Sequence, residues 1–288
     1  MNQSNLSNII LGSAQFGLDY GINNSSGKLT EREIFNILNF SQEKGIKTID
    51  AANAYGNAND IIGKFIKINP DSFKINTKFF FNKFPIEDQL DETLDKLNIN
   101  SINTCFFHDY NDFKEHGNKL RNLKETGRIK KIGLSVYSNN EFQEACMTNW
   151  IDVIQFPYNI LDNNYQRNEV IQIAKKNGKE IQARSIFLQG LFFMQIDKIP
   201  QNLFLLKPYL KEIHRIILKK NINLINLCLG YVNYNKFIDS IIIGVDSFDQ
   251  IVANTEISNL YLNEEVVKLV DEIKVMEKEL LLPKNWRI

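Results

Sequence analysis

Short apolar runs alternate with longer helical patterns along the chain, and this alternation constrains the fold more than any other feature. Each run has the length and apolar content of a buried strand, and each following stretch places apolar residues at helical spacing. The segment "FKINTKFFF" followed by "PIEDQLDETLDKLN" is representative. The chain contains eight such units, and eight units in about 250 residues are what a closed (β/α)8 barrel requires.

We therefore predict an α/β protein that forms a (β/α)8 TIM barrel, with a single domain over residues 1–288 and an additional C-terminal helix and tail. The segment "NIILGSAQFG" is expected to be the first strand. A helix over "EHGNKLRNLKETGR" is expected to follow the fourth strand. The last amphipathic helix is expected over "NEEVVKLVDEIKVMEKELL", before the tail "PKNWRI".

Local signals support these boundaries. Thr30 and Glu33 have the spacing of a capping box, and Gly45 follows as a helix stop. Pro85 marks the start of another helix, because proline is tolerated in the first turn.

A doubly wound open sheet is the alternative fold, and it would usually carry a glycine-rich phosphate loop after its first strand. No GxG occurs anywhere in the chain. In "GINNSSGKLT" the two glycines are one residue too far apart for a phosphate loop, and Leu29 follows Lys28 where Ser or Thr is required. We therefore interpret this segment as a surface turn.

Composition excludes several classes of function. The 34 Lys and Arg residues balance 34 Asp and Glu residues, which argues against a nucleic-acid-binding protein or an anionic-membrane binder. No apolar run is long enough for a membrane span, and the N-terminus is unlike a signal peptide. The three cysteines have no metal-ligand spacing, so we predict no metal site, reduced buried thiols and a cytoplasmic location.

Ionisable residues of four kinds follow three neighbouring strands: Asp50 and Tyr55, then Lys78, then His108. Each has a structural explanation by itself, such as a turn cap, a rim residue, a surface lysine or a satisfied histidine. The active sites of barrels lie at the C-terminal ends of the strands. Because the four residues would meet there, a catalytic function is the better interpretation.

The four side chains suit the reduction of a carbonyl group. A tyrosine has a pKa of about 10, and a neighbouring ammonium such as Lys78 would lower the pKa of Tyr55. Asp50 would hold Lys78, Tyr55 would give a proton to the carbonyl oxygen, and His108 would donate a hydrogen bond to the same oxygen. The hydride must then come from a cofactor.

From "LGSAQFG" to "GVDSFDQIVAN" the chain resembles the aldo-keto reductases, a family of NAD(P)H-dependent (β/α)8 barrels. The resemblance implies that Asp50, Tyr55, Lys78 and His108 are the family's catalytic tetrad, with Tyr55 as the proton donor. The segment "LGSAQFGLDYGI" is similar to a branch often encoded beside surface-polysaccharide genes. A sugar carbonyl, free or nucleotide-linked, is therefore an expected substrate.

The same resemblance implies the cofactor-binding residues. Gln155 and Ser135 would hold the nicotinamide carboxamide, although Val136 replaces the family's usual Asn. Arg184 stands where a stacking Tyr is common, and it would stack on the nicotinamide or bind an anionic group of the substrate. The expected cofactor-binding residues are Gly12, Ser13, Ser135, Gln155, Arg184, Ser185, Phe187, Gly244, Ser247, Gln250 and Asn254.

The resemblance leaves NADPH or NADH open as the cofactor. Asp246 lies inside the adenosine-end motif, and its charge would repel a 2′-phosphate, so we expect weak selectivity for NADP. The expected partner is a small-molecule carbonyl substrate, and the oligomeric state is left open. Aromatic candidates for the substrate pocket are Phe16, Tyr20, Phe79, Tyr110 and Trp286.

Two other functions fit the same residues. The first is a regulatory barrel that binds NAD(P) but turns over slowly, which the changes at Val136 and Arg184 would allow. The second is an isomerase or lyase that uses a tightly held nicotinamide transiently.

Overall fold

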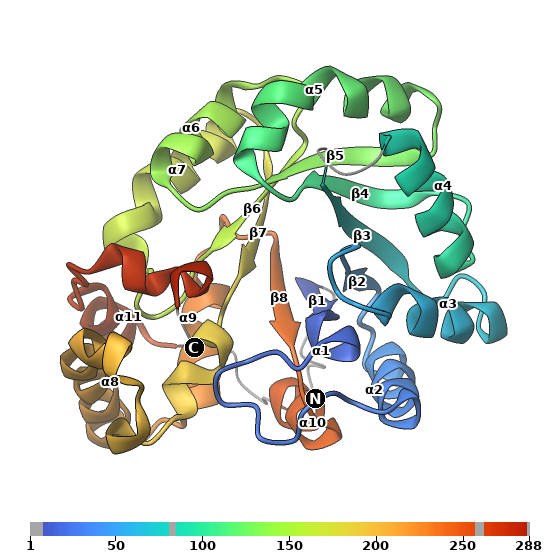
Figure 1. Ribbon diagram of the computed structural model, residues 1–288. Coiled ribbons are helices and arrows are strands. Elements are labelled where there is room, and N and C mark those ends of the chain that lie inside the picture. The colour runs from blue at the N-terminus through green and yellow to red at the C-terminus, as the bar shows by residue number, and fades with distance from the viewer. Residues whose placement is uncertain (1–7, 81–84, 257–261, 287–288) are drawn as a thin grey trace.

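The computed structural model describes residues 8–80, 85–256 and 262–286. Its strands are all parallel and form one closed barrel in chain order, with β1 paired to β8 (Figure 1). This confirms the predicted (β/α)8 barrel. The strands are β1 (Ile9–Gly12), β2 (Thr48–Asp50), β3 (Lys74–Phe79), β4 (Ile102–Phe107), β5 (Ile129–Ser135), β6 (Val153–Pro157), β7 (Glu180–Arg184) and β8 (Ser240–Gly244).

The strand register brings the predicted site residues to one level. Gly12 pairs with Asp50 on one side and with Gly244 on the other. Ser135 pairs with Gln155 in the same way. Because all strands run in one direction, their C-terminal ends form one ring, and residues at these ends face a common space.

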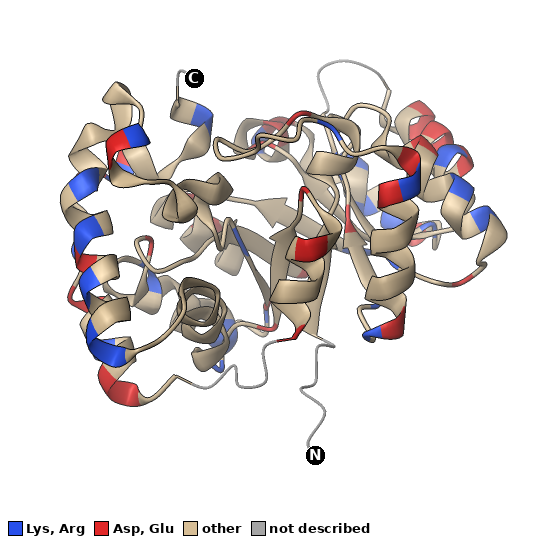
Figure 2. Ribbon diagram, turned by 90° about the horizontal axis from the view of Figure 1, so that it is seen from below, with Lys and Arg blue, Asp and Glu red and all other residues tan. Residues whose placement is uncertain are grey.

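Helices surround the ring of strands (Figure 1), and acidic and basic residues are interspersed along them (Figure 2). None of the described helices is both long and apolar enough to cross a membrane. The helices are α1 (Ala14–Gly17), α2 (Glu31–Glu43), α3 (Ala58–Ile68), α4 (Ile86–Leu97), α5 (Tyr110–Glu125), α6 (Asn139–Met147), α7 (Asn164–Lys176), α8 (Lys207–Lys220), α9 (Leu224–Tyr234), α10 (Phe248–Thr255) and α11 (Glu264–Asp271).

The capping signals operate as predicted. Thr30 Oγ1 accepts a hydrogen bond from the backbone N–H of Glu33 at 3.3 Å, and Glu33 Oε2 accepts one from the backbone N–H of Thr30 at 2.8 Å. Pro85 directly precedes α4. Helix α5 begins at Tyr110, earlier than predicted, because the Asp109 side chain caps it through the backbone N–H of Asn111 at 2.8 Å.

The predicted first strand is only partly correct. It ends at Gly12, and the rest of the segment forms the short helix α1. Gly17 explains the turn, because a Cβ atom built there would lie 1.7 Å from the carbonyl oxygen of Tyr55. The chain therefore folds back to pack against the loop that follows β2.

The predicted C-terminal helix is too long. Helix α11 ends at Asp271, and the chain continues through the 3-10 turns Lys278–Leu281 and Pro283–Asn285. Asn163 Nδ2 donates to the carbonyl oxygens of Val270 and Ile273 at 2.8 and 2.9 Å. These bonds satisfy carbonyls at the helix end and stabilise its termination there.

Candidate functional site

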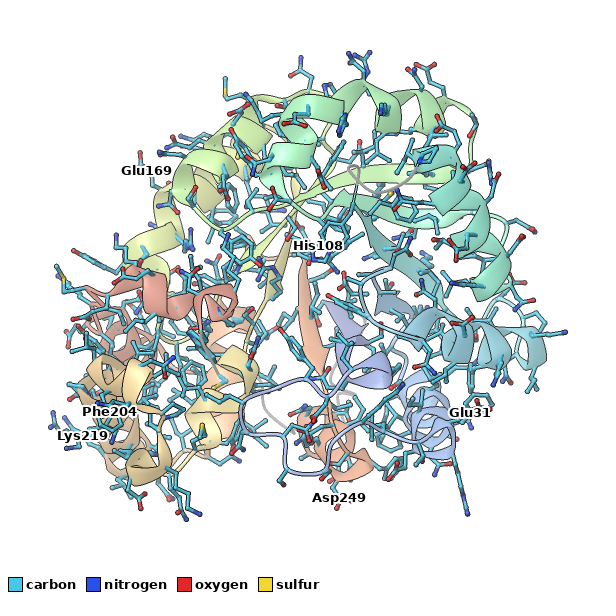
Figure 3. The ribbon with its side chains drawn as sticks, viewed as in Figure 1. Glu31, His108, Glu169, Phe204, Lys219 and Asp249 are labelled. Carbon is cyan, nitrogen blue, oxygen red and sulfur yellow. The ribbon has the colours of Figure 1, made fainter. Side chains whose placement is uncertain are left out.

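A cavity of about 630 Å³ opens at the C-terminal ends of the strands. All four predicted catalytic residues line it, and so do all of the predicted cofactor-binding residues except Ser247. The cavity extends from His108, near the centre of the ring of strands, to Asp249 at α10 (Figure 3). The lining members of the predicted set are Gly12, Ser13, Asp50, Tyr55, Lys78, His108, Ser135, Gln155, Arg184, Ser185, Phe187, Gly244, Gln250 and Asn254.

Lys78 and Asp50 form a buried ion pair at the base of this cavity. Their exposed fractions are 2% and 3%, and Lys78 Nζ contacts Asp50 Oδ1. Lys78 Nζ also donates to the carbonyl oxygen of Ala51 at 3.2 Å, and Gln155 Nε2 donates to Asp50 Oδ2 at 2.9 Å. Burial opposes the charged form of Lys78, but Asp50 and Tyr55 together outweigh it and raise the pKa of the ammonium. Lys78 is therefore a fixed cation.

Tyr55 lies beside this cation, with Lys78 Nζ 5.5 Å from the centroid of its ring. The position depends on a close approach of two glycines, because a Cβ atom on Gly56 would lie 2.4 Å from the carbonyl oxygen of Gly17. Burial raises the pKa of Tyr55, and the charge of Lys78 opposes that rise without reversing it. The predicted lowering of the Tyr55 pKa is therefore wrong for the protein without cofactor.

His108 follows β4 and stacks on Phe80, with ring centroids 4.5 Å apart. Burial and the neighbouring charges of Lys78 and Arg184 lower the pKa of His108 to about 3. The imidazole is therefore neutral at physiological pH and carries one N–H. Its Nδ1 atom is buried and has no hydrogen-bond partner among the described residues.

The end of β6 presents an unused acceptor to the cavity. Gln155 is fully buried, and its Oε1 atom has no hydrogen-bond partner among the described residues. Such an atom is costly unless a ligand supplies a donor, and a carboxamide NH₂ fits this requirement. Ser135 lies next to it in the register and also lines the cavity. The apolar side chain of Val136 is buried in the core, so it supplies no hydrogen bond to the cavity.

At the end of β8, Gly244 has no side chain, so a ligand in the cavity could approach the backbone there. A Cβ atom on Gly244 would lie 2.6 Å from Gln15 Oε1, and Gln15 itself lines the cavity. A larger side chain at Gly244 would therefore clash with Gln15 at the wall of the cavity. The cavity thus combines an open backbone edge with an unsatisfied amide acceptor, and both features fit a nicotinamide dinucleotide.

The α10 end of the cavity carries acidic and amide side chains. Asp246, Asp249, Gln250 and Asn254 line it. Gln250 is fixed to Asp246, because the backbone N–H of Asp246 donates to Gln250 Oε1 at 3.0 Å. Ser247 does not line the cavity and instead caps α10 through the backbone N–H of Gln250 at 3.3 Å. The cationic side chains among the described lining residues, Lys78 and Arg184, are on strands β3 and β7.

Two segments meet over the cavity. Gln189 Nε2 donates to the hydroxyl of Tyr20 at 2.9 Å, and both residues line the cavity. Figure 1 shows the loop after α1 extending across the strand ends toward the segment after β7. Because Gly21 and Asn24 also line the cavity, the segment interpreted as a surface turn is part of the site.

The aromatic candidates for the pocket divide clearly. Tyr20 lines the cavity, whereas Phe16 and Phe79 are fully buried in the core. The hydroxyl of Tyr110 donates to Glu144, and the indole of Trp286 donates to the carbonyl oxygen of Leu280 at 2.8 Å, so these two are engaged elsewhere. Neither Tyr110 nor Trp286 is among the described residues that line the cavity.

Several residues that line the cavity were not predicted from the sequence. They include Gln15, Asn23, Tyr137, Ile186, Gln189, Phe193, Ile225 and Asp249.

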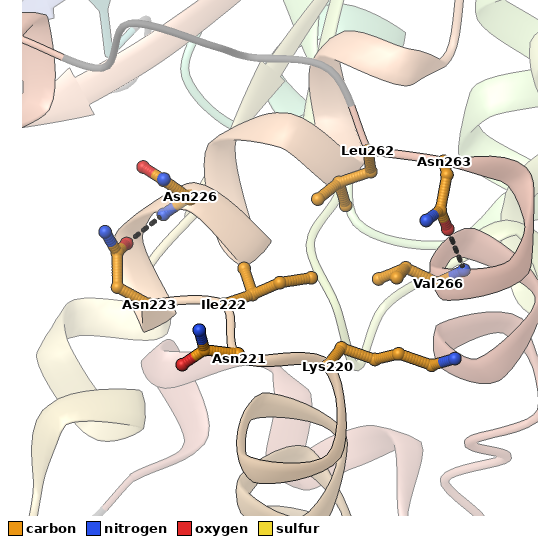
Figure 4. A pocket seen from close by; sticks show the side chains of 8 residues that line it. All are labelled: Lys220, Asn221, Ile222, Asn223, Asn226, Leu262, Asn263 and Val266. Carbon is orange, nitrogen blue, oxygen red and sulfur yellow. Dashed lines mark hydrogen bonds between the residues drawn. The ribbon is translucent and has the colours of Figure 1, made fainter.

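A second cavity, of about 650 Å³, lies between the end of α8, the start of α9 and α11 (Figure 4). Its described lining consists of four Asn residues, three apolar residues and Lys220. Two of these Asn side chains, Asn223 and Asn263, cap the helices α9 and α11. No carboxylate, thiol or imidazole is among the described lining residues of this second cavity, whereas the four predicted catalytic residues line the strand-end cavity.

Comparisons with known proteins agree with this geometry. The NADH-specific methylglyoxal reductase of Escherichia coli (strain K12) is 23% identical over 273 residues, covering 80% of this chain and 83% of that protein. Aldo-keto reductase str7 of Strobilurus tenacellus is 25% identical over 179 residues, covering 56% of this chain and 52% of that protein. A solved aldo-keto reductase structure from Pseudomonas aeruginosa has a TM-score of 0.65 at 18% identity, covering 94% of this chain and 93% of its own, and supports the fold.

The model of the Aldo/keto reductase family matches residues 8–275, which is nearly the whole chain. This match includes every strand of the barrel and all of the residues that place the ion pair, the tyrosine and the histidine around one cavity. The chain therefore belongs to the aldo/keto reductase family, whose members are nicotinamide-dependent oxidoreductases.

Proposed function

We propose that the protein reduces an aldehyde or ketone to an alcohol with NAD(P)H, and that Tyr55 is the proton donor. One observation carries this proposal: a buried Lys78–Asp50 pair lies beside Tyr55 in a cavity that His108 also lines. An uncharged tyrosine next to a fixed cation is suited to give up a proton as negative charge develops on a carbonyl oxygen.

The roles follow from the electrostatics. The raised pKa of Tyr55 keeps the phenol protonated at neutral pH, so it is ready to act as an acid. Once the proton has left, the phenolate is stabilised by Lys78, which is held in place by Asp50. Asp50 in turn accepts a hydrogen bond from Gln155. Neutral His108 can donate its one N–H to the carbonyl oxygen and thereby orient the substrate.

The cofactor contacts are proposed for Ser135 and Gln155 at the carboxamide, and for the backbone edge at Gly12 and Gly244 at the rest of the dinucleotide. When bound, the reduced nicotinamide supplies the hydride that the carbonyl carbon accepts. Tyr55 supplies the proton to the oxygen, so the carbonyl gains one hydride and one proton and becomes an alcohol.

We further propose that NADH is used at least as well as NADPH. Asp246 and Asp249 lie at the α10 end of the cavity, where a 2′-phosphate would be repelled. The similarity to a protein named as an NADH-specific reductase agrees with this proposal. Steady-state kinetics and binding titrations with both cofactors test it, and a hundredfold preference for NADPH would contradict it.

The substrate is proposed to be a compact aldehyde or ketone, including a sugar carbonyl. A cavity of about 630 Å³ that also accommodates a dinucleotide favours a small substrate over a nucleotide-linked sugar. The methylglyoxal reductase named above acts, by its name, on such a small dicarbonyl. A panel of small aldehydes, open-chain sugars and one nucleotide-linked keto-sugar separates these substrate classes.

The replacement Tyr55→Phe tests the proposed reaction. It should lower kcat for carbonyl reduction by about 10²–10⁴-fold, because the acid is lost, while the Kd for NADH stays within about twofold. Tyr165→Phe, on the exposed face of α7, is the matched control and should leave both values unchanged.

The two alternative functions give different results in the same assays. A regulatory barrel would bind NADH but show only slow turnover of every carbonyl, with or without Tyr55. An isomerase or lyase would retain its nicotinamide through purification and convert substrate without net oxidation of NADH. Failure to bind either cofactor would refute the proposal as a whole.

A further inference from the structure

Two cations gather around one aromatic ring beside the catalytic cavity. The Arg184 guanidinium lies 4.3 Å from the centroid of the Tyr137 ring, and Lys284 Nζ lies 3.9 Å from it. Arg184 ends β7, and Lys284 belongs to the C-terminal 3-10 turn. The fold therefore brings like charges from distant segments to one place, where they repel each other unless an anion joins them.

No carboxylate of the described residues forms an ion pair with either cation. Glu141, in the first turn of α6, accepts hydrogen bonds from the backbone N–H groups of Tyr137 and Ser138 at 2.7 and 3.1 Å. It serves the N-terminal cap of α6. The positive charge of Arg184 and Lys284 is thus left without an anionic partner in the part of the chain that the structure describes.

The Arg184 guanidinium also has N–H donors that make no hydrogen bond to the described residues. Its hydrogen bonds to Ser185 Oγ and to the carbonyl oxygen of Val136 are long, at 3.3 Å each. An arginine has five N–H donors in a planar fork that matches a carboxylate or phosphate. Because Arg184 lines the cavity, its remaining donors are accessible to a ligand there.

Arg184 acts on the same groups that the proposed reaction uses. Its charge lowers the pKa of His108 and opposes the raised pKa of Tyr55. The other cation of the cavity, Lys78, is already neutralised by Asp50. An anion that enters the catalytic end therefore finds one unneutralised guanidinium.

We propose that the substrate is a carbonyl compound that also carries a carboxylate or phosphate, and that Arg184 binds this anionic group. This assignment rests on the proposed carbonyl reduction and names the substrate class for it. The carbonyl oxygen lies between Tyr55 and His108, while the anionic group reaches the Arg184 fork. Lys284 is exposed, so its charge is screened and adds less than that of Arg184.

A matched pair of aldehydes tests the proposal: succinic semialdehyde, which carries a carboxylate, and its neutral methyl ester. Glyceraldehyde 3-phosphate against glyceraldehyde forms a second arm, and it distinguishes a phosphate from a carboxylate. In the unmodified protein we expect kcat/KM to favour at least one anionic member by about tenfold to hundredfold, the range for charged hydrogen bonds.

The variant Arg184→Gln should remove this preference, measured as the ratio of kcat/KM for the anionic member to kcat/KM for its neutral partner. Because Arg184 also acts on Tyr55 and His108, its loss affects both members of a pair, and the ratio cancels that shared effect. Arg184→Lys keeps the charge and the aliphatic stem, so it should fold normally and retain part of the preference. Lys284→Gln should reduce the preference by about threefold or less. Lys219→Gln, on the exposed face of α8, is the control and should change nothing.

The Kd for NADH, measured by fluorescence, separates the other roles of Arg184. If Arg184→Gln weakens NADH binding and leaves the anionic preference intact, the guanidinium contacts the cofactor and the proposal is overturned. Equal rates for charged and neutral aldehydes in the unmodified protein also overturn it, while carbonyl reduction itself stands. No turnover of any aldehyde refutes the proposed function, and this assignment with it.

Discussion

Removing Lys78 should destabilise the protein strongly, because it leaves a buried carboxylate without its counter-ion. In the variant Lys78→Met, Asp50 remains 3% exposed and keeps one donor, Gln155 Nε2 at 2.9 Å. Truncating one partner of a buried pair costs about 3–5 kcal/mol. We expect the lower end, about 3 kcal/mol, because the Gln155 bond retains part of the stabilisation. For a chain of this length the melting temperature should fall by roughly 6 °C.

Urea unfolding followed by tryptophan fluorescence measures this loss, with the m-value as a check that the same structure unfolds. The control is Lys64→Met on α3, whose partner Glu31 and whose own side chain are about half exposed. That variant should change the free energy of unfolding by less than about 0.5 kcal/mol. The double variant Lys78→Met with Asp50→Asn should recover most of the loss, because no unpaired charge is then buried.

The result that refutes this reasoning is specific. If Lys78→Met is as stable as Lys64→Met, the pair does not carry a buried charge in solution. If the double variant is less stable than Lys78→Met alone, the cost comes from packing or from Gln155 rather than from the unpaired carboxylate.

Three further predictions concern pH, packing and thiol reactivity. Burial and the charge of Lys78 lower the pKa of His108 to about 3, whereas an unfolded histidine titrates near 6.5. Its contribution to stability is therefore complete above pH 6.5 and is lost as the pH falls toward 3. Urea midpoints should show a loss of about 2 kcal/mol from pH 6.5 to 5, which His108→Gln should lack. Gly17→Ala should lower the free energy of unfolding by at least about 1–3 kcal/mol and reduce activity, because the added methyl group shifts the Tyr55 loop. In the control Gly178→Ala the methyl group meets no atom within 4 Å, so the free energy of unfolding should fall by only about 1 kcal/mol. The three buried cysteines, whose pKa values are raised by burial, should react with a thiol reagent only after unfolding, and fast labelling of the folded protein would contradict this.

The sequence predicted most of the site because the barrel has a simple geometry. Asp50, Lys78 and His108 end or follow adjacent parallel strands, and such strands place their C-terminal ends at one edge. Ser247 is the exception: its side chain caps α10, and it is not among the described residues that line the cavity. A motif match alone could not distinguish a helix cap from a cavity-lining residue.

Other features could not be predicted because they depend on segments that meet only in the folded chain. Tyr137 and Lys284 approach each other across the barrel rim, and Tyr20 meets Gln189 over the cavity. Loops show no periodic pattern that would reveal such contacts. The direction in which the pKa of Tyr55 shifts was also predicted wrongly, because it depends on whether burial outweighs the charge of Lys78.

By itself the sequence determined the strand-helix alternation, and with it the barrel and the three adjacent strands that carry the proposed catalytic groups. Hydrophobic periodicity and strand order are local and topological properties, so they can be predicted from the order of residues. Only the tertiary structure decided how deeply the Lys78–Asp50 pair is buried, which atom of Gln155 is left unsatisfied, and that Arg184 has no carboxylate partner among the described residues. Burial, hydrogen bonding and ion pairing each depend on neighbouring residues from all parts of the chain, so they are fixed only when the chain folds. Together they determine the electrostatic environment inside the cavity.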